Sequence, residues 1–334
     1  MPANAADPQT LRASLAVAER RVPQSRGSGN LFWACSTCSH LPVVILAAGG
    51  AGWAADSFKL HRGLRCSLIS GNMKISSEFY ETLGRLWWSD DAGFDFTSLR
   101  YSVNPLRCAY FERQLAQLGA PGKAMLDVGC GGGFLAEEFA RHGHNVTGID
   151  PSANSVAAAR EHAAQNSLSI QYHVGRGESL PFPDGSFDIV ACCDVLEHVD
   201  DPNQVIHEVS RTLRTGGLLL YDTVNRTIVS KILMIKLWQD WNLTGSFHLN
   251  THVWEKFIKP HELTGMMRSA DLVPGEMRGM LPQKNPAALL CALWRIRTGR
   301  IRGGAIAKEF ALREADDLDV SYMGWARKQL GAAR

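Results

Sequence analysis

The sequence lacks an apolar run long enough to be a convincing membrane span. Residues 27–55 carry no charged side chain, but their continuously apolar part, from about Leu41 to Ala55, is short for a bilayer. That part also contains Pro42 and a Gly49-Gly50 pair. We therefore interpret residues 1–72 as a poorly ordered N-terminal extension and expect the folded domain to occupy residues 73–334.

The chain also lacks an excess of charge of either sign. It has 35 Lys and Arg residues against 33 Asp and Glu residues, a formal net charge of +2. Without a basic surface, nucleic acid is not an expected partner. Among the eight cysteines there is one C-x-x-C, Cys35 and Cys38, and no second pair to complete a zinc site. We expect buried, reduced thiols in a cytosolic protein.

Strands and helices are predicted to alternate after two initial helices at 76–88 and 105–118. Strands at 123–128, 145–149, 170–174, 187–195 and 218–224 are separated by helices or loops, with helices at 134–142, 155–165 and 202–214. This alternation is typical of an α/β fold with a doubly wound, mostly parallel sheet that is covered on both faces. The rhythm stops after Asn225, and the next helix begins near Pro260. Residues 226–259 are therefore predicted to form an insertion that acts as a lid.

A glycine-rich turn follows the first predicted strand, in the segment from Asp127 to Gly133 with sequence DVGCGGG. Gly129 and Gly131 would let a ligand approach the backbone closely at the carboxyl end of the strand. The pattern for NAD needs a third glycine where this chain has Phe134, which disfavours a dehydrogenase. An acid at Asp127 instead suits the cationic amino-acid end of S-adenosylmethionine.

A second acid, Asp150, ends the next predicted strand. A carboxylate at this position can accept hydrogen bonds from two ribose hydroxyls, which neutral side chains reproduce poorly. The plain alternative is that Asp127 caps a helix and Asp150 lies in a turn.

With these motifs the chain resembles a known family. Residues 125–224 resemble class I methyltransferases, and about residues 76–334 resemble the ubiquinone-biosynthesis O-methyltransferases, which methylate catechol-type hydroxyls on polyprenylated rings. The resemblance implies a seven-stranded sheet, N-terminal helices, S-adenosylmethionine as methyl donor, and a donor pocket that includes Arg107 and the backbone of Val195. It is carried by DVGCGGG and by these further segments: Trp87-Trp88, Asn104–Arg107, Cys193–Val199, Thr251-His252, Phe257–Pro260 with Glu262-Leu263, and Asp319–Met323.

One position departs from the family pattern. Many class I enzymes place an aspartate for the adenine amine where this chain has Arg176, which cannot accept a hydrogen bond. Either Glu178 replaces that acid or the backbone alone holds adenine.

Acid and histidine side chains follow the fourth predicted strand, at Asp194, Glu197 and His198. The resemblance to eukaryotic members implies that these three residues bind magnesium, which would lower the pKa of a catechol hydroxyl. The alternative is that they shape the loop beside the donor. His198 and His252 are predicted catalytic residues, with His252 as a candidate general base near neutral pH.

Two segments, Ile228–Trp241 and Pro286–Arg302, combine apolar residues with tryptophan and basic side chains. Such helices can lie in a membrane interface, where a prenylated phenol would also be found, although most amphipathic helices simply cover a core. We predict contact with an anionic membrane surface and with a biosynthetic complex. The expected location is cytoplasmic and peripheral at the inner membrane, with the mitochondrial matrix face as the alternative.

The sequence thus predicts an O-methyltransferase that acts on a phenolic hydroxyl of a prenylated ubiquinone precursor. One alternative keeps the fold and donor but uses a secondary-metabolite hydroxyl. Another is a non-catalytic binding module that retains the donor fold, against which the intact Asp127, Gly129, Gly131 and Asp150 argue.

Overall fold

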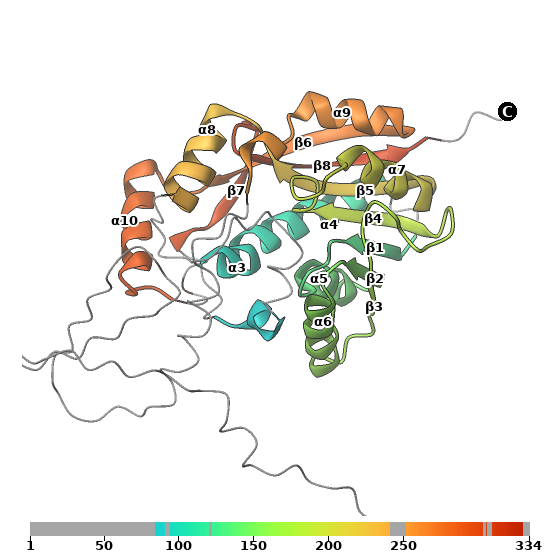
Figure 1. The fold of residues 1–334 in the computed structure, drawn as a ribbon, viewed down its shortest axis with the longest axis horizontal. Coiled ribbons are helices and arrows are strands. Elements are labelled where there is room, and N and C mark those ends of the chain that lie inside the picture. The colour runs from blue at the N-terminus through green and yellow to red at the C-terminus, as the bar shows by residue number, and fades with distance from the viewer. Residues whose placement is uncertain are drawn as a thin grey trace, which may run out of the picture. The chain divides into compact units, whose positions relative to one another are not determined.

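The computed structural model describes residues 84–90, 94–119, 122–240, 252–302, 305 and 309–329 (Figure 1). The predicted extension over residues 1–72 lies outside these ranges. So does most of the predicted helix 76–88, whose described part, Gly84–Trp88, is a 3₁₀ helix labelled η1.

A mixed sheet of eight strands forms the centre of the described residues, in the order β3-β2-β1-β4-β5-β8-β6-β7. Strands β3, β2, β1, β4 and β5 run parallel, whereas β8 is antiparallel to β5 and to β6, and β7 is antiparallel to β6. The doubly wound fold is confirmed, with eight strands in place of the seven expected. Their bounds are β1 Ala124–Val128, β2 Asn145–Asp150, β3 Gln171–Val174, β4 Phe187–Cys193, β5 Leu213–Val224, β6 Leu272–Pro282, β7 Leu312–Ala315 and β8 Ser321–Lys328.

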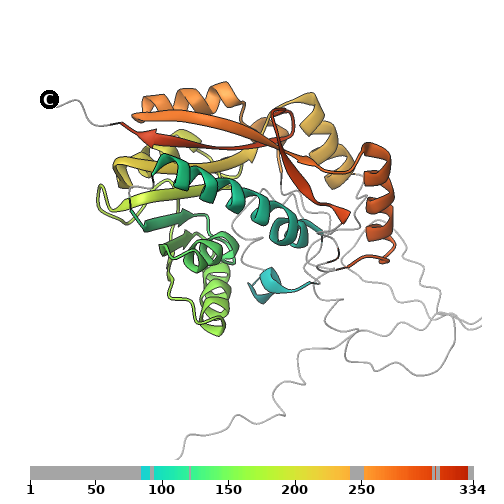
Figure 2. The ribbon, with the colours of Figure 1, turned by 180° about the vertical axis from the view of Figure 1, so that it is seen from behind.

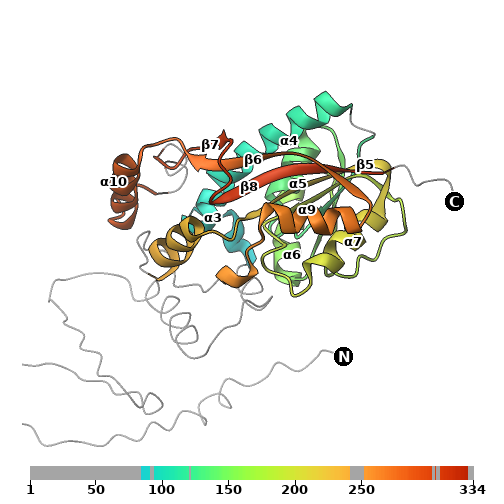
Figure 3. The same ribbon diagram turned by 90° about the horizontal axis from the view of Figure 1, so that it is seen from above.

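Helices cover both faces of the sheet (Figures 2 and 3). The first face packs against α4, α5 and α6, and the second against α7 and α9. Strand β4 is apolar on both of its faces, which is why both need cover. Its residues Ala191 and Cys193 belong to the apolar cluster on the first face, and Val190 and Cys192 belong to the cluster on the second. The helices are α3 Phe94–Ser98, η2 Leu99–Val103, α4 Asn104–Leu118, α5 Phe134–Arg141, α6 Ala153–Gln165, α7 Pro202–Thr212 and α9 Pro260–Ser269.

The order of the strands brings distant acids to one edge of the sheet. Strand β1 lies between β2 and β4. The chain winds from β1 to β2 and β3 on one side of it and continues through β4 and β5 on the other, and in such sheets a crevice forms at the carboxyl end of the strand where the order reverses. Asp150 ends β2, while Asp222 of β5 pairs in register with Cys193 at the end of β4. The predicted strand 187–195 stops at Cys193, so Asp194 and Val195 begin a turn at this edge.

The predicted insertion starts as a helix. Thr227 caps α8 Ile228–Ser230, which continues into the π-helix η3 Lys231–Asp240. Residues 241–251 lie outside the described ranges, and a short 3₁₀ helix, η4 Trp254–Lys256, follows. All three ribbon views place α8 and α10 Pro286–Arg297 beyond the same end of β6 (Figures 1, 2 and 3). Within the described ranges, no helix combines the length and apolarity required to span a bilayer.

Candidate active site

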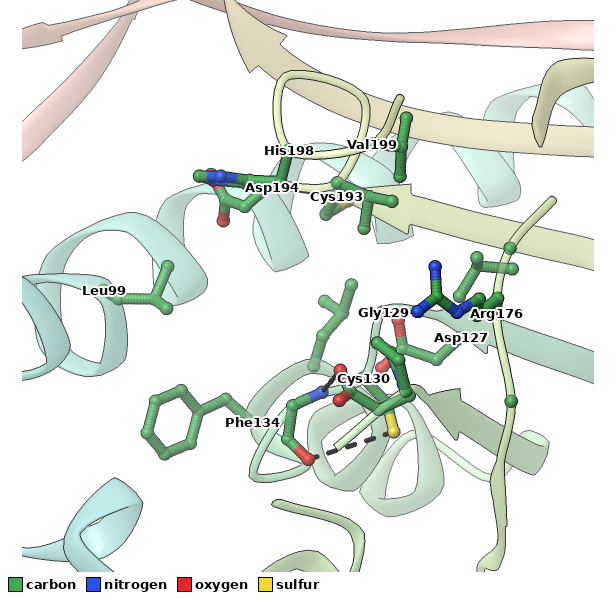
Figure 4. Close-up of a pocket in the computed structure, with 18 of the residues that line it drawn as sticks. Leu99, Asp127, Gly129, Cys130, Phe134, Arg176, Cys193, Asp194, His198 and Val199 are labelled. Carbon is green, nitrogen blue, oxygen red and sulfur yellow. Dashed lines mark hydrogen bonds between the residues drawn. The ribbon is translucent and has the colours of Figure 1, made fainter. Parts of the chain in front are cut away.

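A cavity of about 370 Å³ opens at the carboxyl ends of β1, β2 and β4. The glycine loop lies on one side of it and the turn after β4 on the other (Figure 4). The structure brings all the residues predicted to bind the donor to the wall of this one cavity: Arg107, Asp127, Gly129, Gly131, Asp150, Glu178 and Val195.

The glycines of the loop are required by close packing as well as by backbone geometry. Gly129 and Gly131 have φ values of 74° and 50°, in the region that favours glycine. A Cβ atom on Gly129 would lie 2.2 Å from Cγ2 of Val195, and one on Gly131 would lie 2.7 Å from Cη2 of Trp87. Any larger residue at either position would therefore collide with the side chain of Val195 or Trp87 unless that side chain moved.

Asp127 presents a buried acceptor in the cavity wall. Asp127 is only 2% exposed, and its Oδ2 atom has no hydrogen-bond partner among the described residues. Burial raises the pKa of this carboxyl to about 7, although Arg107 opposes the rise. A cationic group in the cavity would satisfy Oδ2 and favour the ionised form. These features fit the ammonium end of S-adenosylmethionine.

Asp150 is held by the backbone of its surroundings. Its Oδ2 accepts a hydrogen bond from the N–H of Gly131 at 3.0 Å, and its Oδ1 accepts one from the N–H of Ser152 at 2.9 Å. The carboxylate thus ties the glycine loop to the start of α6. A carboxylate has about four acceptor sites, so both oxygens can also accept from ribose hydroxyls.

Arg107 lies between two carboxylates. Its Nη1 donates to Oδ2 of Asp194 at 2.6 Å and to Oδ2 of Asp222 at 3.1 Å, while its Nε donates to Oδ1 of Asn104. Burial alone would lower the pKa of Arg107, but Asp222 and Asp194 raise it well above its usual value. The guanidinium is therefore a permanent cation that faces two carboxylates of the protein.

The turn after β4 carries the predicted catalytic histidine. Asp194 has a positive φ of 53°, and its N–H donates to Oδ1 of Asp222 at 2.8 Å, which holds the turn in place. His198 lines the cavity, and its ring centroid lies 5.3 Å from that of His252. Burial lowers the pKa of His198 to about 3 and that of His252 to about 4. Both half-buried rings are therefore neutral near pH 7, and each is a weaker base than a free imidazole.

Lys256 joins the segment that carries His252 to this turn. Its Nζ donates to the backbone oxygen of Val199 at 3.2 Å and to Oδ1 of Asp200 at 3.0 Å. Both of these residues line the cavity. The segment that carries His252 is therefore attached to the turn after β4 through Lys256 and Val199, which lie 57 positions apart in the sequence.

The predicted magnesium ligands do not form a ligand set. The carboxylate of Asp194 is paired with Arg107, and Glu197, 1% exposed, accepts from Oγ1 of Thr223 at 2.8 Å instead of lining the cavity. Burial raises the pKa of Glu197 to about 8, which favours a neutral carboxyl. In the described part of the chain, no group of three or more His, Cys, Asp or Glu residues could hold a metal. The expectation of a magnesium site at Asp194, Glu197 and His198 therefore has no support among the described residues.

Trp88 anchors the N-terminal helices to the glycine loop. Its indole stacks on the ring of His162 with centroids 3.3 Å apart, and its Nε1 donates to the backbone oxygen of Gly132 at 2.8 Å. Phe134, the residue that excluded the NAD pattern, packs edge-on against Trp88. The large side chain at this position thus has a structural role in closing the loop.

Sequence reasoning missed the apolar wall of the cavity. Trp87, Phe96 and Leu99 line it from η1, α3 and η2. The Trp87-Trp88 pair was the available signal, but a pattern of two tryptophans does not show which surface they cover. On the opposite side Arg176 lines the cavity and points its guanidinium toward Asp127 and the glycine loop (Figure 4).

Known proteins resemble this chain in sequence. The family described as "Methyltransferase domain" matches residues 126–221. A "Ubiquinone biosynthesis O-methyltransferase" of Hahella chejuensis is 38% identical over 258 residues, which cover 75% of this chain and 93% of the relative. A protein of the same name from Actinobacillus pleuropneumoniae is 38% identical over 60% of this chain and 85% of the relative.

A solved structure resembles it in fold. The magnesium protoporphyrin IX methyltransferase from Synechocystis PCC 6803 aligns with a TM-score of 0.51 and 17% sequence identity, covering 76% of this chain and 95% of the other. At this identity the likeness concerns the fold alone.

Proposed function

The chain belongs to the ubiquinone biosynthesis O-methyltransferase family, and we propose that it methylates a phenolic hydroxyl of a polyprenylated ubiquinone precursor. As a member of this family it is an S-adenosylmethionine-dependent O-methyltransferase. The observation that carries the proposal is a single cavity that joins a donor-type glycine loop to the neutral His198, next to His252. We assign the enzyme to residues 73–334, with the insertion at about 226–259 on the acceptor side.

The proposed donor site follows from the groups in the cavity wall. S-adenosylmethionine supplies a methyl group activated by a sulfonium charge. Asp127 receives the ammonium group with its buried Oδ2, and Asp150 accepts from the ribose hydroxyls. Three other contacts are proposed from the cavity lining. Arg107 binds the donor carboxylate, and the backbone of Gly129 and Gly131 contacts the donor. Val195 and Glu178 contact adenine.

The proposed chemical step needs a base for the phenolic proton. The acceptor oxygen forms its bond to the methyl carbon as the carbon–sulfur bond breaks and its electron pair stays on sulfur. A neutral imidazole, from His252 or His198, takes the hydroxyl proton as the bond to the methyl carbon forms, because the oxygen then becomes positively charged and its proton strongly acidic, so that even a weak base can accept it. The apolar wall of Trp87, Phe96 and Leu99 excludes water and positions an aromatic ring for in-line attack.

Labelled donor and a panel of catechols and quinols with short prenyl tails test the proposal. We expect label on a phenolic oxygen, and none on a saturated alcohol with the same tail. His252→Gln and His198→Gln should each lower kcat, by up to about 10²–10⁴-fold if that ring is the base. The matched control is His173→Gln, an exposed ring on β3 outside the cavity. Transfer to none of the phenols, by protein shown to bind the donor, would contradict the proposal.

We further propose that the enzyme works at an anionic membrane surface on the cytoplasmic side, within reach of a biosynthetic complex. The support is an exposed apolar set on α8, η3 and α10, where Ile228 is 75%, Ile232 48%, Leu290 57% and Trp294 50% exposed. Arg300 stacks on Trp294 with 4.4 Å between its Cζ and the ring centroid, which places a cation beside this set. Such a surface suits anionic headgroups.

Flotation with liposomes tests this surface. Binding should require anionic lipid and weaken as salt screens the arginines. Ile228→Glu combined with Trp294→Glu should reduce recovery, whereas Val273→Glu, an exposed position at the start of β6, should not. Equal recovery with neutral and anionic vesicles would contradict the proposal.

A further inference from the structure

Asp222 is a charged residue of the site that does not line the cavity. It is fully buried on β5, with 0% exposure, and its two oxygens have different partners. Oδ2 accepts from Nη1 of Arg107 at 3.1 Å, and Oδ1 accepts from the N–H of Asp194 at 2.8 Å. Arg107 and Asp194 do line the cavity, so Asp222 lies directly behind two groups of its wall.

The charges around Arg107 do not cancel. Its single positive charge is shared by the carboxylates of Asp194 and Asp222, which leaves one negative charge in excess. The cavity lining as a whole also has more acidic than basic side chains. It includes two guanidiniums, those of Arg107 and Arg176, and five carboxyl groups, those of Asp127, Asp150, Glu178, Asp194 and Asp200. Asp222 adds to this excess from behind, in a part of the protein that solvent does not screen.

The donor and the product of methyl transfer differ in charge at one atom. The donor has a sulfonium, an ammonium and a carboxylate, whereas S-adenosylhomocysteine has a neutral thioether in place of the sulfonium. An excess negative charge near the cavity therefore favours the donor over the product, because the other charged groups of the two molecules are the same. A site that neutralised its own charge would not have this preference.

We propose that Asp222 makes the cavity select the sulfonium donor over the thioether product, and so limits product inhibition. The inference rests on the donor site proposed above. Asp222 acts through the field of its charge and through its hold on Arg107 and Asp194; it has no contact with the ligand. A purely structural role would weaken the binding of donor and product by the same factor, whereas a charge effect changes their ratio.

Calorimetric dissociation constants for S-adenosylmethionine and S-adenosylhomocysteine test the proposal in Asp222→Asn. The asparagine keeps an oxygen that can accept from the N–H of Asp194 but removes the charge. Burial raises the pKa of Asp222 to about 7, so the measurement is made at pH 8.5. The preference for donor over product should fall about tenfold, the effect of a unit charge at a distance of about 12 Å and an effective dielectric constant of about 20.

Asp188→Asn is the matched control. Asp188 is also a buried acid, on the neighbouring strand β4, but it lies near the start of that strand, away from the cavity, where it accepts from the N–H of Ala124 and pairs with Arg214. Its replacement should leave the ratio unchanged. Asp222→Ser provides the same charge removal should the asparagine variant fail to fold.

The results separate the inference from the proposed function. An unchanged ratio in folded Asp222→Asn or Asp222→Ser overturns the inference. If Asp150→Ala also binds the donor normally, the donor site itself is misplaced. If Asp150→Ala loses donor binding while the Asp222 variants keep the wild-type ratio, the donor site stands and only the role of Asp222 is refuted.

Discussion

The ionisation of Asp127 should make donor binding depend on pH. Burial raises the pKa of this carboxyl to about 7 in the ligand-free protein. An ammonium group beside Oδ2 favours the ionised form, so binding below pH 7 must release a proton. Donor affinity should therefore rise with pH and level off above pH 7. His198 and His252 do not contribute in this range, since their pKa values are lowered to about 3 and about 4.

The magnitude follows from the fraction of Asp127 that is ionised. With a pKa of about 7, roughly one tenth of the carboxyl is ionised at pH 6 and roughly nine tenths at pH 8. The dissociation constant of the donor should thus be about tenfold higher at pH 6 than at pH 8, close to 1.4 kcal/mol. The free energy of unfolding of the ligand-free protein should depend on pH in the opposite direction. Because the pKa of Asp127 is raised in the folded state, its contribution to stability is lost as pH rises through 7.

Titration calorimetry in buffers with different ionisation enthalpies measures both the affinity and the proton release. The wild type should release about one more proton at pH 6 than Asp127→Asn does. That comparison is needed because burial also raises the pKa values of Asp222 to about 7 and of Glu197 to about 8. A donor affinity that is constant from pH 6 to 8, or the same pH dependence in Asp127→Asn, would refute the reasoning.

Three further outcomes are expected. Asp150→Ala should weaken donor binding by about 1.5–3 kcal/mol, the usual contribution of a hydrogen bond to a charged acceptor; an unchanged calorimetric affinity would remove Asp150 from the site. Trp88→Phe should lower donor affinity several-fold, because it loses the bond to the oxygen of Gly132, and equal affinity would limit Trp88 to packing. Excess chelator should leave methyl transfer unchanged, since Asp194 and Glu197 are paired within the protein; activity lost with chelator and restored by magnesium would show that a metal rearranges this turn.

The sequence was sufficient to predict that the residues of the proposed donor site converge on one cavity. The alternation of strands and helices implied parallel strands, and parallel strands place their carboxyl ends at one edge. Asp127, Gly129 and Asp150 follow such ends, so their convergence was predictable from local spacing and the topology it implies. Phe134 separated the methyl-donor pattern from the NAD pattern by its size alone.

The tertiary structure alone decided which of the remaining polar groups are available. Asp194, Glu197 and His198 are neighbours in the sequence and have the composition of a ligand set. In the folded protein, however, Arg107, 87 positions earlier, takes the carboxylate of Asp194. Glu197 instead accepts from Thr223 of the neighbouring strand. Spacing along one segment cannot reveal such partners, because each comes from a different strand or helix.

The same reason applies to Asp222 and to the pairing of His198 with His252. Asp222 falls within the predicted strand 218–224, which gave no sign of a role for it, and its position behind Arg107 depends on the register between β4 and β5. His252 reaches His198 because Lys256 attaches its segment to the turn after β4. The sequence by itself determined the fold and the donor loop through local periodicity and glycine. The charge balance of the site and the pairing of His198 with His252 were decided by long-range packing, which brings together side chains that no local pattern connects.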